Sequence, residues 1–244
     1  MTIGDGMKER IIWGIIAAVL LIIVTLSDSI VLNIAYIVLM VLAISEIWHL
    51  LYRCEKSKIL NQTKKVATFI VLSIFVALCF FCIVLLRHKD NTGPIVVWLA
   101  FIGAFSTDTF AYIFGMWLGQ KRKHFIFPKI SPKKTLEGAI GGIVGTTIIF
   151  LLWGIIGNHI FDTSYAYLDF DFNLVSLTIL GFLCGFVAQA GDLLASALKR
   201  KFGVKDFGSI LPGHGGILDR CDSLMLVAPF VLLFISLFSV VISN

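Results

Sequence analysis

Long stretches of apolar residues alternate with short polar segments along most of the chain. Because about 20 apolar residues in a helix cross roughly 30 Å of hydrocarbon, runs of this length predict membrane-spanning helices. The seven apolar runs are Ile11–Leu26, Ile30–Leu51, Val66–Leu86, Pro94–Leu118, Gly138–Phe161, Leu174–Leu198 and Ile217–Ile242. The pattern therefore predicts an all-α, polytopic integral membrane protein with about seven transmembrane helices.

The first apolar run is shorter than the others, and Lys8 and Arg10 precede it as they would precede the core of a signal peptide. It ends in Ser27-Asp28-Ser29 instead of the small-x-small pattern of a cleavage site. We therefore expect this run to be retained as the first span. Its length requires little tilt, a thinner bilayer or help from flanking residues.

Basic residues alternate strongly between the segments that connect the apolar runs. If the N-terminus is inside, 18 of the 20 Lys and Arg residues lie in inside segments, and the outside segments hold only Arg87 and Lys89. Cytoplasmic loops of membrane proteins carry this excess of basic residues. The distribution predicts seven spans with the N-terminus in and the C-terminus out, and it places the polar motifs at the cytoplasmic side of a cell inner (plasma) membrane.

Composition supports the same fold class. The chain has 244 residues, of which 58% are hydrophobic and 14% are charged, whereas a soluble domain is about 45–50% apolar and about 25% charged. The net charge of +5 follows from the topology and suits an anionic substrate, so we expect no nucleic-acid partner. We expect one integrated membrane domain, with three spans in 1–93 and a catalytic region in 94–244.

Ionisable residues inside spans are costly and usually face a cavity or a partner. The first half of the chain offers Glu46 and His49, near the inner end of the second run, and an interfacial snorkelling pair is favoured there over a functional site. The second half offers Asp108 in the middle of the fourth run and Asp192 in the sixth. These acids make the second half the expected location of the chemistry.

Helical spacing groups several polar residues of the second half. Asp192, Ser196 and Lys199 are predicted to share one stripe of a helix, and Asp219, Asp222 and Ser223 to share a face of the next. Structural salt bridges, for instance between Asp192 and Arg220, are an alternative explanation. Carboxylates that meet at a membrane surface suit Mg²⁺, which prefers oxygen ligands together with substrate phosphates.

Two basic, glycine-bearing segments, 121–138 and 199–216, accompany these acids. Lysines neutralise phosphate oxygens, and glycines let backbone N–H groups approach them. Acids and basic loops on one side of the membrane predict Mg²⁺-assisted phosphoryl or nucleotidyl transfer. His214 lies in the second segment, where it is equally suited to be a general acid, a phosphate donor or a hydrogen-bonded loop residue.

Glycines cluster at the start of the fifth run, at Gly138, Gly141, Gly142 and Gly145. Small residues at this spacing let two helices approach closely in a membrane. We therefore expect this face to pack against a neighbouring helix.

The polar residues of the second half resemble the signature of the phosphatidate cytidylyltransferases, or CDP-diacylglycerol synthases. The segment from Ser196 to Asp222 matches the pattern S-x-x-K-R-x4-K-D-x5-P-G-H-G-G-x-x-D-R-x-D. Two shorter blocks agree: Asp108 to Gly115 resembles D-[ST]-x-A-Y-x-x-G, and Ser131 to Gly138 resembles S-P-K-K-T-x-E-G. Phe110 and Ala195 depart from residues common in the family. The resemblance covers about residues 94–230, and the first three spans show only general hydrophobicity.

The resemblance implies transfer of CMP from CTP (or dCTP) to phosphatidic acid at the membrane, with Mg²⁺ required and a homodimer as the assembly. The implied metal ligands are Asp192, Ser196 and Asp219, and Asp222 is a candidate either to support these ligands or to bind a second metal ion. The other implied catalytic residues are Lys199, Arg220 and His214. The implied substrate-binding residues are Lys133, Lys134, Ser131, Arg200, Lys205, Gly213, Gly215, Gly216, Asp108 and Tyr112. The alternatives are a CTP-dependent polyprenol or phytol kinase and, with less support, a membrane transporter.

Overall fold

The computed structural model describes residues 3–27, 29–53, 61–88, 93–119, 124–160, 174–210 and 215–242. The helices are α1 (Ile3–Leu26), α2 (Ser29–Arg53), α3 (Gln62–Arg87), α4 (Gly93–Phe114), α6 (Leu136–Ile160), α7 (Leu174–Phe202), α8 (Leu218–Cys221) and α9 (Leu224–Ile242). Within the described ranges, five helices are long and apolar enough to cross a membrane, and the apolar parts of α1 and α9 are shorter. The predicted all-α polytopic membrane fold is confirmed, while the number of spans and their orientation stay predictions.

The chain divides into two compact units, and helices α3 and α7 contribute to both. Unit 1 comprises Met1–Val84 and Ala195–Asp222, and unit 2 comprises Leu85–Leu194 and Ser223–Asn244. The segment that carries most of the signature thus belongs to the same unit as the first helices of the chain. The expected division between 1–93 and 94–244 rested on where polar residues lie in the sequence, and it stays a prediction.

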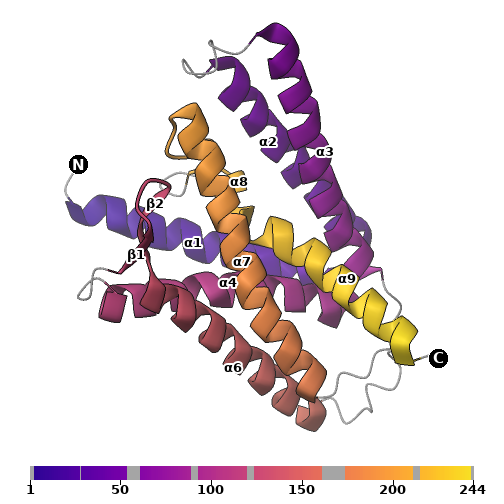
Figure 1. The fold of residues 1–244 in the computed structure, drawn as a ribbon. Helices are drawn as coiled ribbons and strands as arrows, with labels where there is room; N and C mark the ends of the chain where they lie inside the picture. Colours follow the sequence, from indigo (N-terminus) through magenta and orange to yellow (C-terminus); the bar gives the residue numbers. More distant parts are fainter. Residues whose placement is uncertain are drawn as a thin grey trace. The chain divides into compact units, whose positions relative to one another are not determined.

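In unit 1, α2 contacts α1 and runs beside α3, both of which lie next to it in sequence (Figure 1). The ring of Trp48 stacks on Tyr52 with 4.0 Å between centroids, and it meets the Phe69 ring edge-on at 5.4 Å. Leu32 and Leu51 of α2 are fully buried. The sequence of α2 is hydrophobic almost all round. One apolar face of the helix therefore packs in this core, while another is exposed, as a helix in contact with lipid requires.

In unit 2, the most extensive helix pair is α4 with α6, and the glycine cluster of α6 lies in that interface. A Cβ at Gly138 would lie 2.7 Å from the Ala111 carbonyl oxygen, and one at Gly142 would lie 3.0 Å from the Thr107 carbonyl oxygen. The buried hydroxyls of Thr107 and Thr146 hydrogen-bond across the same interface at 2.7 Å. The predicted glycine-mediated packing is confirmed.

The basic segment before α6 is more ordered than the loop that the sequence predicts. After α4 the chain makes a π-helical turn (Gly115–Gly119), and then β1 (Phe125–Phe127) pairs antiparallel with β2 (Ser131–Thr135). The hairpin stands at the start of α6 (Figure 1). Its turn is closed by the Ile130 N–H, which donates to the Phe127 carbonyl at 3.1 Å. Strands of three and five residues are too short to show a period-2 pattern in the sequence.

The last apolar run is not one helix, as the sequence predicts, because the chain turns at Asp222 and Ser223 between α8 and α9. The Ser223 hydroxyl donates to the Asp108 carboxylate, with both oxygens at 3.0 Å. The Ser223 carbonyl in turn accepts the Val227 N–H at 3.2 Å and begins α9. This polar anchor separates a four-residue helix from the final apolar helix.

Candidate active site

The signature residues of unit 1 form a compact cluster around Lys199, near the end of α7. The Lys199 ammonium lies 2.8 Å from Asp219 Oδ1 and 3.7 Å from Asp222 Oδ2. It also lies 5.1 Å from the centre of the Phe207 ring, a cation–π distance. The side chains of Lys199 and Asp219 are 10% and 6% exposed, so this ion pair is shielded from water. We call Lys199, Phe207, Gly216, Asp219 and Asp222 the signature cluster.

Asp219 connects three parts of this cluster through one carboxylate. Its Oδ1 accepts from Lys199, while its Oδ2 accepts the Phe207 N–H at 2.8 Å and the Gly216 N–H at 3.0 Å. Gly215 beside it has φ +83°, which an L side chain rarely adopts, and a Cβ there would lie 3.2 Å from Asp219 Oδ2. The signature glycine is therefore required by the backbone around the carboxylate.

The predicted shared face is confirmed for two of its three residues. Asp219 and Asp222 both face Lys199, whereas Ser223 lies beyond the turn and hydrogen-bonds to Asp108. Spacing of three and four residues placed all three on one helix face, but the helix ends after Cys221. The Ser223 side chain therefore contacts Asp108 and does not share the face of Asp219 and Asp222.

Glu46 of α2 is a site residue that the sequence reasoning missed. Its side chain is 1% exposed; Oε1 accepts the Ile217 N–H at 2.8 Å and Oε2 accepts the Leu218 N–H at 2.9 Å. The interfacial snorkelling interpretation is therefore wrong for Glu46, while His49 is exposed. The available signal was the presence of one acid in an otherwise apolar run, which by itself does not name a partner 171 positions away.

In unit 2, Lys134 of β2 forms a second cluster with α7, which we call the hairpin cluster: Lys134, Gln189 and Asp192. The Lys134 ammonium lies 2.6 Å from Asp192 Oδ2 and 3.5 Å from the Gln189 carbonyl oxygen. Gln189 Nε2 donates to the Ala139 carbonyl at 2.9 Å, which joins α7 to α6. Asp192 thus forms a salt bridge, as the structural alternative expected, with Lys134 as its partner.

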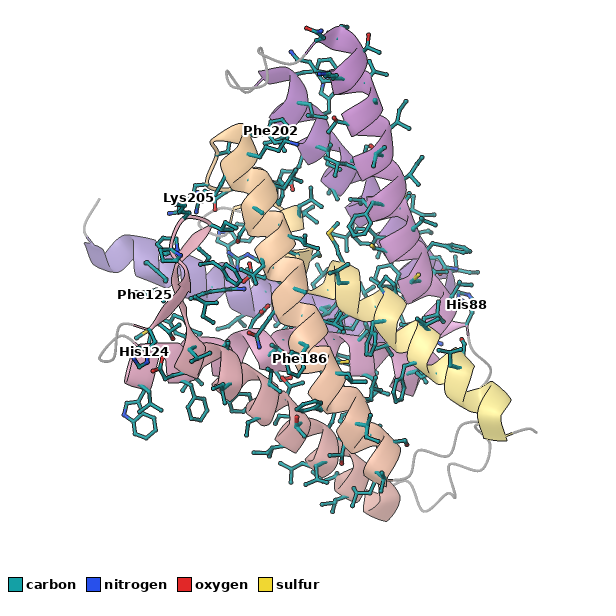
Figure 2. All side chains as sticks on the ribbon, in the orientation of Figure 1. His88, His124, Phe125, Phe186, Phe202 and Lys205 are labelled. Carbon is teal, nitrogen blue, oxygen red and sulfur yellow. The ribbon has the colours of Figure 1, made fainter. Side chains whose placement is uncertain are left out.

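The other predicted site residues are more open. Asp108 accepts from Ser223, and Tyr112, one turn further along α4, is 66% exposed. Figure 2 marks Lys205 just beyond the end of α7. Half-buried are Ser131 and Ser196; exposed are Lys133, Arg200, Lys205 and Arg220. Gly213 and His214 lie outside the described residues.

The donor chemistry of the predicted metal ligands fits a hard divalent cation, since carboxylate and hydroxyl oxygens are its usual ligands. In the part of the chain that the structure describes, no group of three or more His, Cys, Asp or Glu side chains could hold a metal ion. Lysine ammonium groups balance the charge of Asp192 and Asp219. Asp192 belongs to unit 2, and Ser196 and Asp219 belong to unit 1. The metal assignment therefore stays a prediction.

Cys221, beside the signature acids, is not suited to nucleophilic chemistry. The residue as a whole is half-buried, but desolvation of its thiol raises the pKa to about 12, and the Asp222 and Glu46 carboxylates act in the same direction. The thiol is protonated at neutral pH, and the thiolate is the reactive form.

The sequence profile of the cytidylyltransferase family matches residues 8–238, almost the whole chain. The chain belongs to the cytidylyltransferase family. The phosphatidate cytidylyltransferase of Bacillus subtilis (strain 168) is 40% identical over 167 residues, which is 68% of this chain and 57% of that protein. That of Synechocystis sp. is 42% identical over 159 residues, or 64% of this chain and 49% of that protein.

A third relative, the phosphatidate cytidylyltransferase of Staphylococcus saprophyticus, is 42% identical over 146 residues, or 60% of this chain and 51% of that protein. The chain thus spans about half the length of the curated relatives that it matches. The family assignment confirms the resemblance drawn from the three sequence blocks.

Proposed function

We propose that this cytidylyltransferase transfers CMP from CTP to phosphatidic acid, giving CDP-diacylglycerol and pyrophosphate for phospholipid biosynthesis. Membership of the family and the names of the relatives support the proposal. The structural observation that carries it is the signature cluster, where a shielded Lys199–Asp219 pair orders the segment that leads into α8. Such a preorganised, charged backbone segment suits the binding of phosphates.

In the proposed reaction, a phosphate oxygen of phosphatidic acid attacks the α-phosphorus of CTP. A new phosphorus–oxygen bond forms, the bond from the α-phosphorus to the bridging oxygen breaks, and pyrophosphate leaves with that electron pair. A phosphomonoester has a second pKa of about 6, so the nucleophile is largely ionised at pH 7 and needs no strong general base. The main difficulty is to bring two polyanions together and to stabilise their charge.

The basic residues of the family's sequence blocks supply that stabilisation in the proposal. Lys133 and Lys134 on β2, with Arg200 and Lys205 at and beyond the end of α7, bind phosphate oxygens of CTP or phosphatidic acid. The N–H groups of Gly213 and Gly215 approach pyrophosphate. Gly216 has a supporting role, because its N–H already donates to Asp219. Asp108 and Tyr112 order the cavity or contact the nucleotide.

Mg²⁺ is the proposed cofactor, with Asp192, Ser196 and Asp219 as its ligands and Asp222 as a candidate for a second ion. Bound Mg²⁺ neutralises phosphate charge during the transfer. Chelation with EDTA is expected to stop turnover, and added Mg²⁺ to restore it. Full activity in the presence of excess EDTA would overturn this part of the proposal.

The remaining parts of the proposal concern location and assembly. The distribution of Lys and Arg supports an inner-membrane enzyme with its active site facing the cytoplasm. The acyl chains of phosphatidic acid stay in the lipid, which requires a lateral opening between spans. The family resemblance supports a homodimer, and crosslinking in native membranes tests it.

The deciding experiment supplies the purified protein in detergent with phosphatidic acid, Mg²⁺ and CTP labelled at the α-phosphorus. We expect label in the organic phase and release of pyrophosphate. CDP formed from CTP after addition of a long-chain alcohol, without label in the lipid, would establish a lipid kinase instead. Absence of turnover with every acceptor would overturn the enzymatic proposal.

A further inference from the structure

We propose that Glu46 is a positioning residue, which holds the start of α8 in place through the backbone N–H groups of Ile217 and Leu218. This role goes beyond the proposed transfer reaction, because it assigns a function to a residue of α2, outside the three sequence blocks of the family. Two observations within unit 1 support the proposal. One is the hydrogen-bond geometry of the Glu46 carboxylate, and the other is the close approach of two glycines to that carboxylate.

The hydrogen-bond geometry is that of a dedicated acceptor. Each oxygen of the buried Glu46 carboxylate accepts one N–H, at 2.8 Å from Ile217 and 2.9 Å from Leu218. Burying a carboxylate is costly unless hydrogen bonds or an opposite charge compensate it. The partners that the structure shows for Glu46 are these two backbone N–H groups, so backbone dipoles provide the compensation.

The second observation is the close approach of two glycines to Glu46. A Cβ at Gly216 would lie 2.6 Å from both carboxylate oxygens, and a Cβ at Gly208 would lie 2.6 Å from Oε1. Real Cβ atoms do not approach that closely, so the carboxylate lies in a space that only bare backbone leaves. The lack of a side chain at Gly216 is therefore needed to make room for the Glu46 carboxylate, whether or not a ligand is bound.

The consequence of this contact reaches Asp219. Ile217 and Leu218 immediately precede Asp219, whose carboxylate binds Lys199 and the N–H groups of Phe207 and Gly216. The segment 216–219 is thus held by two carboxylates, one from α2 and one of its own. Loss of Glu46 therefore removes one of the two carboxylates that hold the segment next to the lysine–aspartate pair.

Hydrogen–deuterium exchange of the purified protein tests the proposal without any substrate. In E46Q, which nearly keeps the volume of the side chain, one acceptor oxygen becomes an NH₂ group that faces a backbone N–H. We expect exchange at Ile217 or Leu218 to rise about tenfold, since a buried N–H loses its charged acceptor, and to rise further at both in E46A.

S45A is the matched control. The Ser45 hydroxyl donates to the Leu42 carbonyl at 2.7 Å within α2, so its loss removes a neighbouring hydrogen bond that does not leave the helix. We expect wild-type exchange at positions 217 and 218 in S45A. Wild-type exchange in E46Q, with a change only in E46A, would overturn the acceptor role and leave Glu46 as a packing residue.

Gly216 offers a second, independent arm. G216A forces its new Cβ against the carboxylate and is expected to raise exchange at 217 and 218. In the E46A background that steric conflict is gone, so G216A should add little, a strong departure from additivity. Simple additivity of the two substitutions would contradict the proposed contact.

Turnover supplies a readout that rests on the proposed function. We expect kcat to fall at least tenfold in E46Q, with KM for CTP changed by less than about threefold, because the substitution misplaces the cluster and removes no substrate contact. An unchanged kcat would overturn the positioning role. If the wild-type protein turns over no CTP, the proposed transferase function fails, whereas the exchange results still decide the role of Glu46.

Discussion

The signature cluster of unit 1 and the hairpin cluster of unit 2 immobilise basic residues in different ways. In the signature cluster, the Asp219 carboxylate accepts two backbone N–H groups and pairs with Lys199 in a shielded environment, and the Glu46 carboxylate of the same unit also accepts two backbone N–H groups. In the hairpin cluster, the Lys134–Asp192 pair is about one-quarter exposed. There, strand pairing and glycine contacts between α6 and α4 hold the backbone.

This difference separates two kinds of lysine. Lys199 is enclosed by Asp219, Asp222 and Phe207, so removal of a partner leaves a poorly solvated charge. The side chains of Lys134 and Asp192 are partly exposed to water, so we expect their salt bridge to contribute little to stability and to be exchangeable for a phosphate. We expect substitutions in the signature cluster mainly to lower the free energy of unfolding, and substitutions in the hairpin cluster mainly to change substrate binding.

The largest expected effect comes from D219N, which breaks the signature cluster. The substitution removes the negative charge that pairs with Lys199. It also replaces one carboxylate oxygen of residue 219 with an NH₂ group, which cannot accept a hydrogen bond. We therefore expect a loss of about 3 kcal/mol in the free energy of unfolding and no measurable turnover. Denaturant unfolding in detergent measures the first, and the labelled-CTP assay the second. D222N is the control, with a loss of about 1 kcal/mol, because Asp222 lies 3.7 Å from Lys199. Retained turnover in D219N would contradict the proposed roles of Asp219.

G138A tests how the hairpin cluster is held. Its Cβ would lie 2.7 Å from the Ala111 carbonyl, so α6 must shift, and we expect a loss of about 1–3 kcal/mol in unfolding free energy. In the control G154A, the nearest atoms to the new Cβ are the ends of the Leu174 and Leu177 side chains, at 3.1 Å and 3.0 Å. Those flexible ends can move, so G154A should cost less. Equal losses would show that close packing at Gly138 is not special.

Double-mutant cycles compare the two ion pairs directly. For K134A and D192N we expect a coupling energy below about 1 kcal/mol, since both side chains are partly exposed. For Lys199 and Asp219 the same cycle should give a larger value. K134A alone should nevertheless raise KM for CTP or phosphatidic acid, because Lys134 is a proposed phosphate contact. Equal coupling energies for the two pairs would remove the distinction between the clusters.

The smallest effect is expected at Cys221. With a thiol pKa of about 12 in the folded protein and about 8.5 when unfolded, the folded state retains its proton longer. Stability from this group is complete below pH 8.5 and is lost as pH rises toward 12. Alkylation of Cys221 at pH 8, followed by mass spectrometry, should be much slower in the folded than in the denatured protein. C221A should change turnover by less than twofold.

Much of the fold could be predicted from the pattern of apolar residues. Membrane helices satisfy their backbone hydrogen bonds internally, so a long apolar run predicts a helix without knowledge of its neighbours. The glycine face of α6 and the shared face of Asp219 and Asp222 were equally local, since both follow from helical spacing. The family followed from a fixed spacing of polar residues between Ser196 and Asp222.

The errors lie where a distant partner decides. The break between α8 and α9 depends on the Asp108 carboxylate, which anchors Ser223, and the β-hairpin depends on a pairing too short to leave a pattern. Glu46, the single acid of α2, was interpreted as an interfacial residue because nothing near it in the sequence indicates that the backbone N–H groups of Ile217 and Leu218 are its partners.

The sequence by itself thus determined that the protein lies in a membrane, which segments form helices, and to which family the chain belongs. Long apolar runs and motif spacing are properties of nearby residues in the sequence. Only the tertiary structure decided which charged groups are shielded and which are open. A carboxylate has the same formula at positions 46, 192 and 219, but its energy depends on the donors that folding brings to it. Those donors are backbone N–H groups for Glu46, a partly exposed lysine for Asp192, and both a backbone and a shielded lysine for Asp219.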